Sequence, residues 1–355
     1  MALLPTSVPA NFSTAVMYED QINTGCPHPK LNKWHVTVLP VYIVLIAVLG
    51  IVLNVFVMMV FFLHKKACTM AEIYLSNMAA ADLILMAFLP FWAVYVANKF
   101  NWTFANPLCT LVTLSIRMNA YCSIYFLVLI SIDRYVALVH PLSQEGMRRP
   151  KYAKLGCLLV WCFGLFLSVP TLVYRDVRYF NYSNAHMCYL NYPNATVQRL
   201  CDVMQMTFGF IVPILIISFC TVRIIRALNN RLIVGLNTKK MEHKATTLVL
   251  AVLLAFMICW VPFYLVKALI MLVYADVLTD CTLISILHIC NNIFMYLAFF
   301  NSVLNPILYV IVGNNFRKKV RELFTRWSIN RTTTLNTTST RSIMLRNVTT
   351  MNASS

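Results

Sequence analysis

Seven long apolar runs limit most strongly what this chain can fold into. Each is about 20 residues or longer, the length that an α-helix needs to cross the hydrocarbon core of a bilayer. In lipid the backbone can satisfy its hydrogen bonds only in helices or closed barrels, and barrel strands are short and alternating. We therefore predict an all-α integral membrane protein, a bundle of seven transmembrane helices at about Val38–Leu63, Ile73–Ala97, Leu108–Val139, Ala153–Leu172, Val203–Leu228, Thr246–Val273 and Leu283–Val312.

The composition and charge agree with lipid as the main solvent. Hydrophobic residues make up 60% of the 355 residues and charged residues 12%, against about 45–50% and about 25% in soluble proteins. The formal charge of +17 would suggest a nucleic-acid partner in a soluble protein. Here we attribute it to loops kept in the cytoplasm, which are enriched in Lys and Arg, and we expect no nucleic-acid partner.

The distribution of the loop charges predicts the orientation. The loops after the first, third and fifth runs and the segment after the seventh hold most of the basic residues, whereas the opposite loops hold Lys99, Arg175, Arg178 and Arg199. The richer side is therefore cytoplasmic. We expect a multi-pass plasma-membrane protein with an extracellular N-terminal segment (1–37), the bundle (38–313), an amphipathic helix on the inner membrane surface (314–326) and a cytoplasmic Ser/Thr-rich tail (327–355).

Sequons and cysteines give expectations for the outer surface. Asn11, Asn181 and Asn194 head Asn-X-Ser/Thr sequons in predicted extracellular segments, and Asn101 heads another that lies close to the membrane. Four cysteines lie at or beyond the outer surface, where disulfides persist, and they allow three pairings. Pairing Cys109 with Cys188 would tie the second outer loop across the bundle, and pairing Cys26 with Cys281 would tie the N-terminal segment to the third outer loop; this is the pairing that we expect.

Asp82, in the middle of the second run, is the clearest ionisable residue within the membrane. Asn54, Ser123, Asn301 and Asn305 could surround it. A carboxylate with hydroxyl and amide oxygens suits a small cation such as Na⁺, and a protonated Asp hydrogen-bonded to its neighbours explains the same pattern equally well. We expect no other metal and no cofactor.

Three further motifs lie in or at the end of the runs. Asp133-Arg134-Tyr135 closes the third run, Cys259-Trp260-Val261-Pro262 lies within the sixth, and Asn305-Pro306-Ile307-Leu308-Tyr309 lies within the seventh. A proline inside a helix removes a backbone hydrogen bond and kinks it, so Pro262 and Pro306 are candidate pivots.

These motifs, in this order, resemble those of class A (rhodopsin-like) G-protein-coupled receptors over roughly Pro40 to Arg326. The resemblance implies that Arg134 is a latch for the G protein and Trp260 a rotamer switch below the ligand. It also implies that the cluster around Asp82 is a sodium pocket. The partners implied are a heterotrimeric G protein of Gq or Gi type, receptor kinases and arrestin on the tail, and membrane lipid.

Within this class the chain looks most like the bradykinin receptors. The segments that carry the likeness include Ala79-Ala80-Ala81-Asp82-Leu83, Leu89-Pro90-Phe91-Trp92-Ala93 and Tyr309-Val310-Ile311-Val312-Gly313. The family implies a kinin peptide ligand, either bradykinin or a des-Arg kinin. It also implies signalling through Gq, phospholipase C and calcium.

The expected ligand pocket departs from that family. Ile270 and His288 stand where those receptors have acidic residues that face the peptide's N-terminal arginine. Arg117 stands where the subtype that prefers des-Arg kinins has a lysine facing the terminal carboxylate, and Lys267 adds a second cation. The remaining candidate contacts are Trp260 at the base and acidic residues that could form a rim, namely Asp202, Asp276, Asp280, Glu19 and Asp20.

The sequence raises three alternative functions. A class A receptor for another peptide or an anionic small ligand would use Arg117 and Lys267 together. A transporter or channel is disfavoured because no internal repeat is evident. An enzyme is not expected, because no nucleophile, base and orienting group share a span and no metal-ligand spacing such as His-Glu-X-X-His appears.

Overall fold

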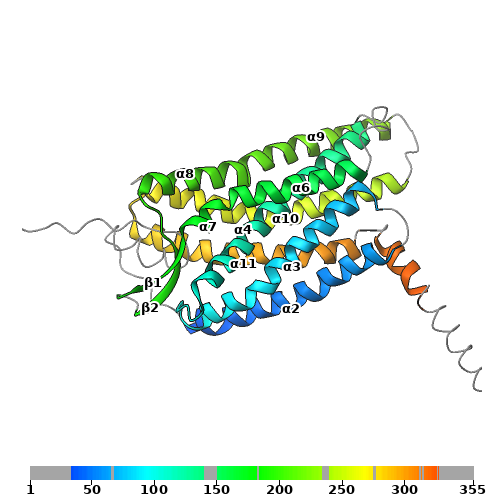
Figure 1. The fold of residues 1–355 in the computed structure, drawn as a ribbon. Coiled ribbons are helices and arrows are strands. Elements are labelled where there is room, and N and C mark those ends of the chain that lie inside the picture. The colour runs from blue at the N-terminus through cyan, green and yellow to red at the C-terminus, as the bar shows by residue number, and fades with distance from the viewer. Residues whose placement is uncertain are drawn as a thin grey trace, which may run out of the picture.

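The computed structural model describes residues 33–64, 68–139, 150–181, 184–233, 240–274, 277–311, 313, 316–325 and 327. Within these residues seven helical stretches are long and apolar enough to cross a membrane, as predicted. The elements are α2 (Lys33–Leu63), α3 (Met70–Ala97), α4 (Asn106–Val139), α6 (Pro150–Leu167), α7 (Val169–Tyr174), β1 (Arg175–Phe180), β2 (Ala185–Leu190), α8 (Ala195–Met206), η2 (Thr207–Ile211), α9 (Val212–Ile233), α10 (Lys240–Tyr274) and α11 (Cys281–Ile311), as drawn in Figure 1.

The helices are longer than the apolar runs that predicted them. The fifth span begins at Ala195 rather than near Val203, and the sixth helix at Lys240 rather than near Thr246. A backbone that already makes helical hydrogen bonds can continue them into the aqueous phase with polar side chains. Hydropathy marks the part of a helix in the hydrocarbon core and says little about where the helix ends.

Prolines interrupt two of the spans and lie inside others. The fourth span breaks at Ser168, and Pro170 lies in the first turn of the short helix α7. In the fifth span a π-helical turn, η2, immediately precedes α9, which contains Pro213. Proline has no N–H to donate, so the preceding turn must rearrange its hydrogen bonds. Pro262 in α10 and Pro306 in α11 lie inside continuous helices.

A two-stranded antiparallel hairpin, β1–β2, covers one end of the bundle, opposite to the end that carries helix 316–325 (Figure 1). Arg175 pairs with Leu190, so the base of the hairpin lies where the fourth span ends. The disulfide between Cys109 and Cys188 ties β2 to the start of α4. Asn106 Nδ2 also donates to Asp176 Oδ1 over 2.9 Å.

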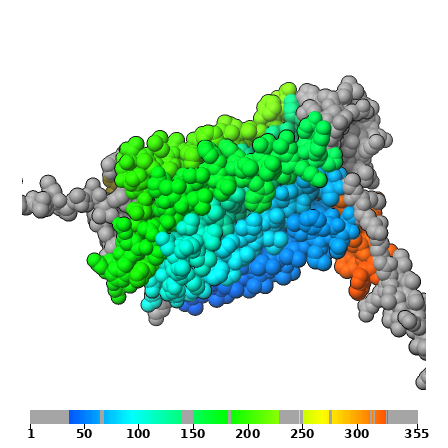
Figure 2. Space-filling model, in the orientation of Figure 1, coloured from blue at the N-terminus to red at the C-terminus, as the bar shows by residue number. Residues whose placement is uncertain are grey.

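The bundle is apolar on its outside and holds its polar side chains inside. Large apolar side chains on the outer faces of the spans are more than half exposed, such as Val52 at 60%, Leu215 at 65% and Leu254 at 62%. Asn54, Asp82 and similar polar residues are fully buried. Figure 2 shows the spans packed side by side along one face. This distribution is the one expected when lipid replaces water as the solvent.

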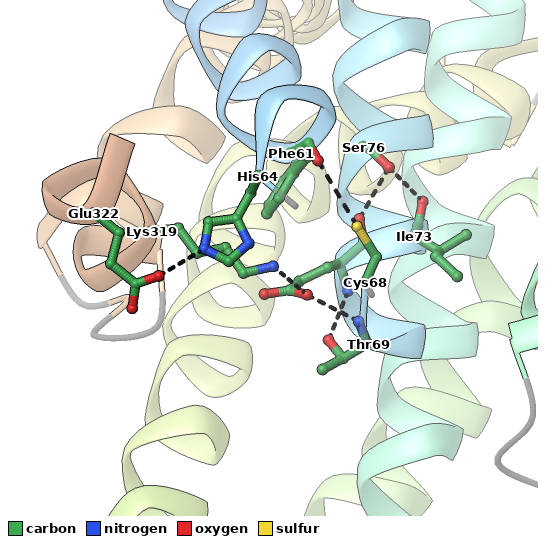
Figure 3. A network of polar contacts seen from close by, with 9 residues as sticks. Phe61, His64, Cys68, Thr69, Ile73, Ser76, Lys319 and Glu322 are labelled. Carbon is green, nitrogen blue, oxygen red and sulfur yellow. Dashed lines mark hydrogen bonds and ion pairs between the residues drawn. The ribbon is translucent and has the colours of Figure 1, made fainter. Parts of the chain in front are cut away.

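Helix 316–325 packs against the end of the bundle through apolar contacts, a salt bridge and a histidine–carboxylate hydrogen bond. Phe316 is buried, with its ring 5.6 Å from that of Phe61. Lys319 Nζ lies 2.9 Å from Glu72 Oε2, and His64 Nε2 lies 3.0 Å from Glu322 Oε2 (Figure 3). The helix is therefore held to the ends of α2 and α3, with exposed basic residues at Arg317, Lys318 and Arg321.

Candidate functional site

A cavity of about 110 Å³ lies inside the bundle, next to the base of the β1–β2 hairpin. Its walls come from helices α3, α4, α7, α8, α10 and α11, and strands β1 and β2 contribute one residue each. Most of the lining is apolar or aromatic, with a few polar side chains, which is the usual character of a small-ligand site. It is the candidate ligand-binding cavity of this chain.

Three cationic side chains from three different elements line this cavity. Arg117 comes from α4, Arg175 from the start of β1, and Lys267 from α10. Lys267 and Arg175 are buried, at 6% and 8% exposure. Burial, with a smaller contribution from the nearby Arg117 charge, lowers the pKa of Arg175 to about 10, and at neutral pH the guanidinium stays protonated. The cavity thus presents positive charge to an incoming ligand.

Sequence reasoning missed Arg175. From the sequence alone, Arg175 is one of four basic residues in the predicted outer loops. Its burial depends on the hairpin register, which places Arg175 opposite Leu190, another residue of the cavity lining. A signal was available in its position directly after the fourth span, 13 residues before Cys188 in the sequence. This position indicates a cavity residue only when it is known that the Cys109–Cys188 disulfide holds the loop against the bundle.

The acidic residues predicted as ligand contacts lie in different surroundings. Asp202 lies beside the main cavity, in a smaller one that it shares with Gln205 and Lys267. Asp280 is solvent-exposed and accepts hydrogen bonds from the backbone of Thr282 and Leu283, so it caps the start of α11. Asp276, Glu19 and Asp20 lie outside the described residues.

Neither Ile270 nor His288 lines the described cavity. Ile270 is 3% exposed and packs in an apolar cluster with Val266 and Leu287. His288 is 5% exposed and lies in α11 directly after Leu287 of that cluster. His288 is therefore buried and does not line this cavity, and its role as a ligand contact stays a prediction.

Trp260 closes the inner end of the cavity as part of an aromatic stack. Its ring is stacked on Phe256, with centroids 5.8 Å apart, and meets Phe263 edge-on at 6.1 Å. Tyr264 stacks in turn on Phe210 at 4.6 Å. Since Trp260 and Phe263 also line the cavity, a ligand there would contact the side chains that flank Pro262 in α10.

A second polar site surrounds Asp82, deeper in the bundle. Asn119 Nδ2 donates to Asp82 Oδ1 over 2.7 Å, and Asn305 Nδ2 to Asp82 Oδ2 over 3.4 Å. Asn54 does not reach the carboxylate in this arrangement: its amide donates to the carbonyl oxygens of Gly50 and Ser302, each over 3.0 Å. Of the predicted residues Asn305 therefore bonds to the carboxylate, and so does Asn119, which sequence reasoning missed.

Several buried oxygens of the predicted sodium set have no hydrogen-bond partner among the described residues. They are Ser123 Oγ, Asn301 Oδ1, Asn305 Oδ1 and Asn54 Oδ1. A buried polar atom left unsatisfied is costly, so an ion or water is the natural partner for such a group. One carboxylate and several neutral oxygens form a donor set that suits Na⁺.

The switch residues lie toward the end of the bundle opposite the hairpin. Arg134 forms an ion pair with the neighbouring Asp133, and the Tyr135 ring lies 5.8 Å from that of Phe219. Tyr309 is 1% exposed, and its hydroxyl lies 3.7 Å from Met78 Sδ. In this structure Arg134 is therefore paired with the neighbouring residue of its own helix.

The structure describes some of the residues predicted to lie at the outer surface and leaves others outside the described residues. The Cys109–Cys188 disulfide is present. Cys281 is disulfide-bonded, and its expected partner Cys26 lies outside the described residues, as does Asn11. Asn181 and Asn194 are exposed, whereas Asn101 is half-buried, and its Oδ1 accepts a hydrogen bond from the His186 backbone.

Comparisons with known proteins agree with this geometry. Residues 53–309 match the family described as "7 transmembrane receptor (rhodopsin family)". The chain is 42% identical to the B2 bradykinin receptor of Homo sapiens, covering 84% of this chain and 77% of that one. It is 44% identical to the B2 bradykinin receptor of Mus musculus, with coverage of 84% and 77%. It is 36% identical to the human B1 bradykinin receptor, with coverage of 81% and 82%.

Proposed function

Because the chain belongs to the rhodopsin-like family of seven-transmembrane receptors, we propose that it is a receptor for a kinin-type peptide. The name of its B2 and B1 relatives, bradykinin receptor, supports a peptide ligand of this kind. Members of the family are receptors and not enzymes. The protein is a multi-pass membrane protein, and we propose the plasma membrane as its location, with the hairpin end and N-terminus extracellular.

The positive charge of the central cavity is the observation that carries the ligand proposal. Arg117, Arg175 and Lys267 all line it, and Asp202 lies in an adjoining cavity. Such a cavity favours a negatively charged group, and a guanidinium binds a carboxylate through two parallel hydrogen bonds. The free C-terminal carboxylate of the peptide therefore enters first, toward Arg117, and the basic N-terminus of a kinin stays near the mouth.

The proposed signal passes from Trp260 to Arg134. A ligand that contacts Trp260 and Phe263 changes the packing around the kink at Pro262 and so biases a bundle with two arrangements. In the second arrangement Arg134 leaves Asp133 and opens a cleft for a heterotrimeric G protein. We propose coupling through Gq to phospholipase C and calcium, with Gi as the alternative. Receptor kinases and arrestin would act on the Ser/Thr-rich tail.

A calcium assay tests this function. Cells that express the chain should raise cytosolic calcium when given bradykinin or a des-Arg kinin, and untransfected cells should not. The assay should run with both peptides side by side, since Arg117 resembles the des-Arg subtype while identity with the B2 relatives, at 42% and 44%, exceeds the 36% with human B1. If neither kinin raises cytosolic calcium in cells that carry the receptor at their surface, the proposal is refuted.

The same three cations support a second candidate, a class A receptor for an anionic small ligand. A cavity of about 110 Å³ can hold a compact anion, and Arg117 with Lys267 would bind it from two sides. A panel of acidic lipids and metabolites, read by the same calcium signal, separates the two candidates. A response to one of them without a response to kinins would favour this reading.

We also propose that Asp82 binds an allosteric sodium ion. The predicted residues Asn54, Asp82, Ser123, Asn301 and Asn305, together with Asn119, would hold it. Asn119 and Asn305 bond to the carboxylate, and the buried side-chain oxygens of the other predicted residues have no hydrogen-bond partner among the described residues. The ion would stabilise the arrangement described above, in which Arg134 forms an ion pair with Asp133. By linkage it must then oppose the agonist-bound arrangement.

Replacing NaCl with choline chloride should therefore raise agonist affinity several-fold in membranes that contain the wild-type chain. Asp82→Asn should abolish this dependence, because the amide carries no charge for the cation. The measurement is competition binding of a labelled peptide at constant ionic strength, with KCl as a second control. A sodium effect that survives in Asp82→Asn would contradict the assignment.

A further inference from the structure

A small cavity of about 10 Å³ adjoins the central ligand cavity, and the two share part of their lining. Asp202 from α8 and Lys267 from α10 both line the small cavity. Lys267, Gln205 and Tyr264 line the central cavity as well, whereas Asp202 does not. Its volume is close to the least that one water molecule needs, about 10–15 Å³, so the two charged side chains lie close together.

Asp202 and Lys267 carry opposite charges in a place that bulk water barely reaches. Lys267 is 6% exposed, and Asp202 is half-buried. The small cavity leaves no room for a layer of bulk water, so the attraction between the two charges is screened far less than on an exposed surface. The Asp202 carboxylate is accordingly attracted most strongly by Lys267 and less by Arg117.

The balance of charge around the two cavities gives Asp202 a distinct place. It is the only acidic residue among the described residues that line either of them, and the cations there are Arg117, Arg175 and Lys267. A buried ammonium that has no negative charge near it is costly. Because Lys267 is the cation that shares the small cavity with Asp202, the carboxylate compensates Lys267 most directly.

The sequence offers a second partner for Asp202 on its own helix. Arg199 precedes it by three residues in α8, a spacing at which opposite charges can pair on a helix surface. Arg199, however, is exposed and lines neither cavity. The charges that act on the Asp202 carboxylate are those of Lys267 and Arg117. The geometry therefore favours a pair between α8 and α10 over a pair along α8.

We propose that Asp202 is the counter-ion of Lys267 and, through it, a specificity-determining residue of the ligand cavity. By neutralising Lys267 it leaves two cations, Arg117 and Arg175, rather than three to bind the negative charge of a ligand. A ligand end with a second carboxylate then gains little from Lys267. The part that concerns the ligand rests on the proposed function. Asp202 thereby acts within the receptor, whereas the sequence suggested that it contacts basic residues of the peptide.

A double-mutant cycle on thermal stability tests the pair without any ligand. Asp202→Asn and Lys267→Met nearly preserve the shapes of the side chains, and each leaves the other charge without its partner. Each should lower the thermal midpoint of the detergent-solubilised receptor by several degrees, and the double variant Asp202→Asn/Lys267→Met should recover most of the loss. A single variant that fails to reach the cell surface counts as destabilised, and recovery of surface expression in the double variant is then the measurement.

Arg199→Ala is the matched control, because it removes the exposed cation of the alternative pair. Combined with Asp202→Asn it should give effects on the thermal midpoint that simply add. Two outcomes would overturn the counter-ion assignment. One is that the losses of Asp202→Asn and Lys267→Met add in their double variant, and the other is that Asp202→Asn couples with Arg199→Ala instead.

Two kinin analogues, one ending in aspartate and the other in asparagine, measure the charge preference. Both keep the free terminal carboxylate, and they differ by one side-chain carboxylate. Asp202→Asn should raise the ratio of their affinities at least fivefold in favour of the aspartate form, because Lys267 becomes available to the second carboxylate. Asp202→Asn/Lys267→Met should return the ratio to its wild-type value, which loss of packing alone would not do.

The two measurements separate this inference from the proposed function. An unchanged affinity ratio in Asp202→Asn would contradict the specificity role of Asp202. If neither analogue binds the wild-type chain, the kinin proposal fails, and the thermal cycle still decides whether Asp202 and Lys267 form a pair.

Discussion

Replacing Arg117 with Ala should lower the affinity of a kinin that ends in a free carboxylate by about 100-fold, and that of its C-terminal amide far less. Removing one partner of a desolvated charge pair costs roughly 2–5 kcal/mol, because the other charge is left without compensation. Because Arg175 and Lys267 also line the cavity, the peptide should keep part of its affinity when Arg117 is removed. The measurement is competition binding of the acid and amide forms of one peptide.

Two variants serve as controls for this result. Arg199→Ala removes a cation that is exposed at the same end of the bundle and does not line the cavity, and it should change neither affinity. Arg117→Lys keeps the charge but not the two-pronged hydrogen bonding, and should lie between wild type and Arg117→Ala. Equal losses for acid and amide would show that Arg117 does not bind the carboxylate.

Breaking the Cys109–Cys188 disulfide should give the largest loss of stability among single substitutions at the hairpin end. The bond closes a loop with a sequence separation of 79 residues. A loop of that length corresponds to about 4.5 kcal/mol of stabilisation in the chain-entropy description. Cys188→Ser should therefore lower the thermal midpoint of the detergent-solubilised receptor sharply. It should also abolish high-affinity peptide binding, since β1 and β2 place Arg175 and Leu190 in the cavity wall.

Cys162→Ser is the matched control for the disulfide, because Cys162 is a free, exposed cysteine on α6. It should leave both the thermal midpoint and peptide affinity unchanged. The double variant Cys109→Ser/Cys188→Ser should be no worse than either single variant, since both remove the same bond. Retention of wild-type stability and affinity by Cys188→Ser would contradict the role given to the hairpin.

Much of the fold could be predicted from the sequence because the bilayer imposes a local rule. Each span must be apolar over its own length, so hydropathy at Val38–Leu63 identifies a helix without knowledge of its neighbours. Motifs such as Asp133-Arg134-Tyr135 carry a family pattern in consecutive residues. The ends of the helices could not be predicted in this way, because no equally local rule governs a helix outside the lipid.

The candidate site was harder to predict, because it depends on which side chains different elements turn toward one space. Arg117 and Lys267 were predicted as ligand contacts and line the cavity, whereas His288, predicted with them, is buried and does not line it. Asp280, another predicted ligand contact, caps the start of α11. In each case the residue type is compatible with ligand binding, and its position relative to the cavity depends on how the helix or turn that carries it packs.

The sequence by itself determined that this chain is a seven-helix membrane protein with an acidic group at Asp82 and a basic one at Arg117 within its spans. Apolar length and intramembrane charge are properties of single segments, so they can be read without a fold. The tertiary structure alone decided that Arg175 lines the ligand cavity, that Asn119 bonds to Asp82, and that Asp202 and Lys267 line one small cavity. These are relations between segments far apart in the chain, and packing fixes them.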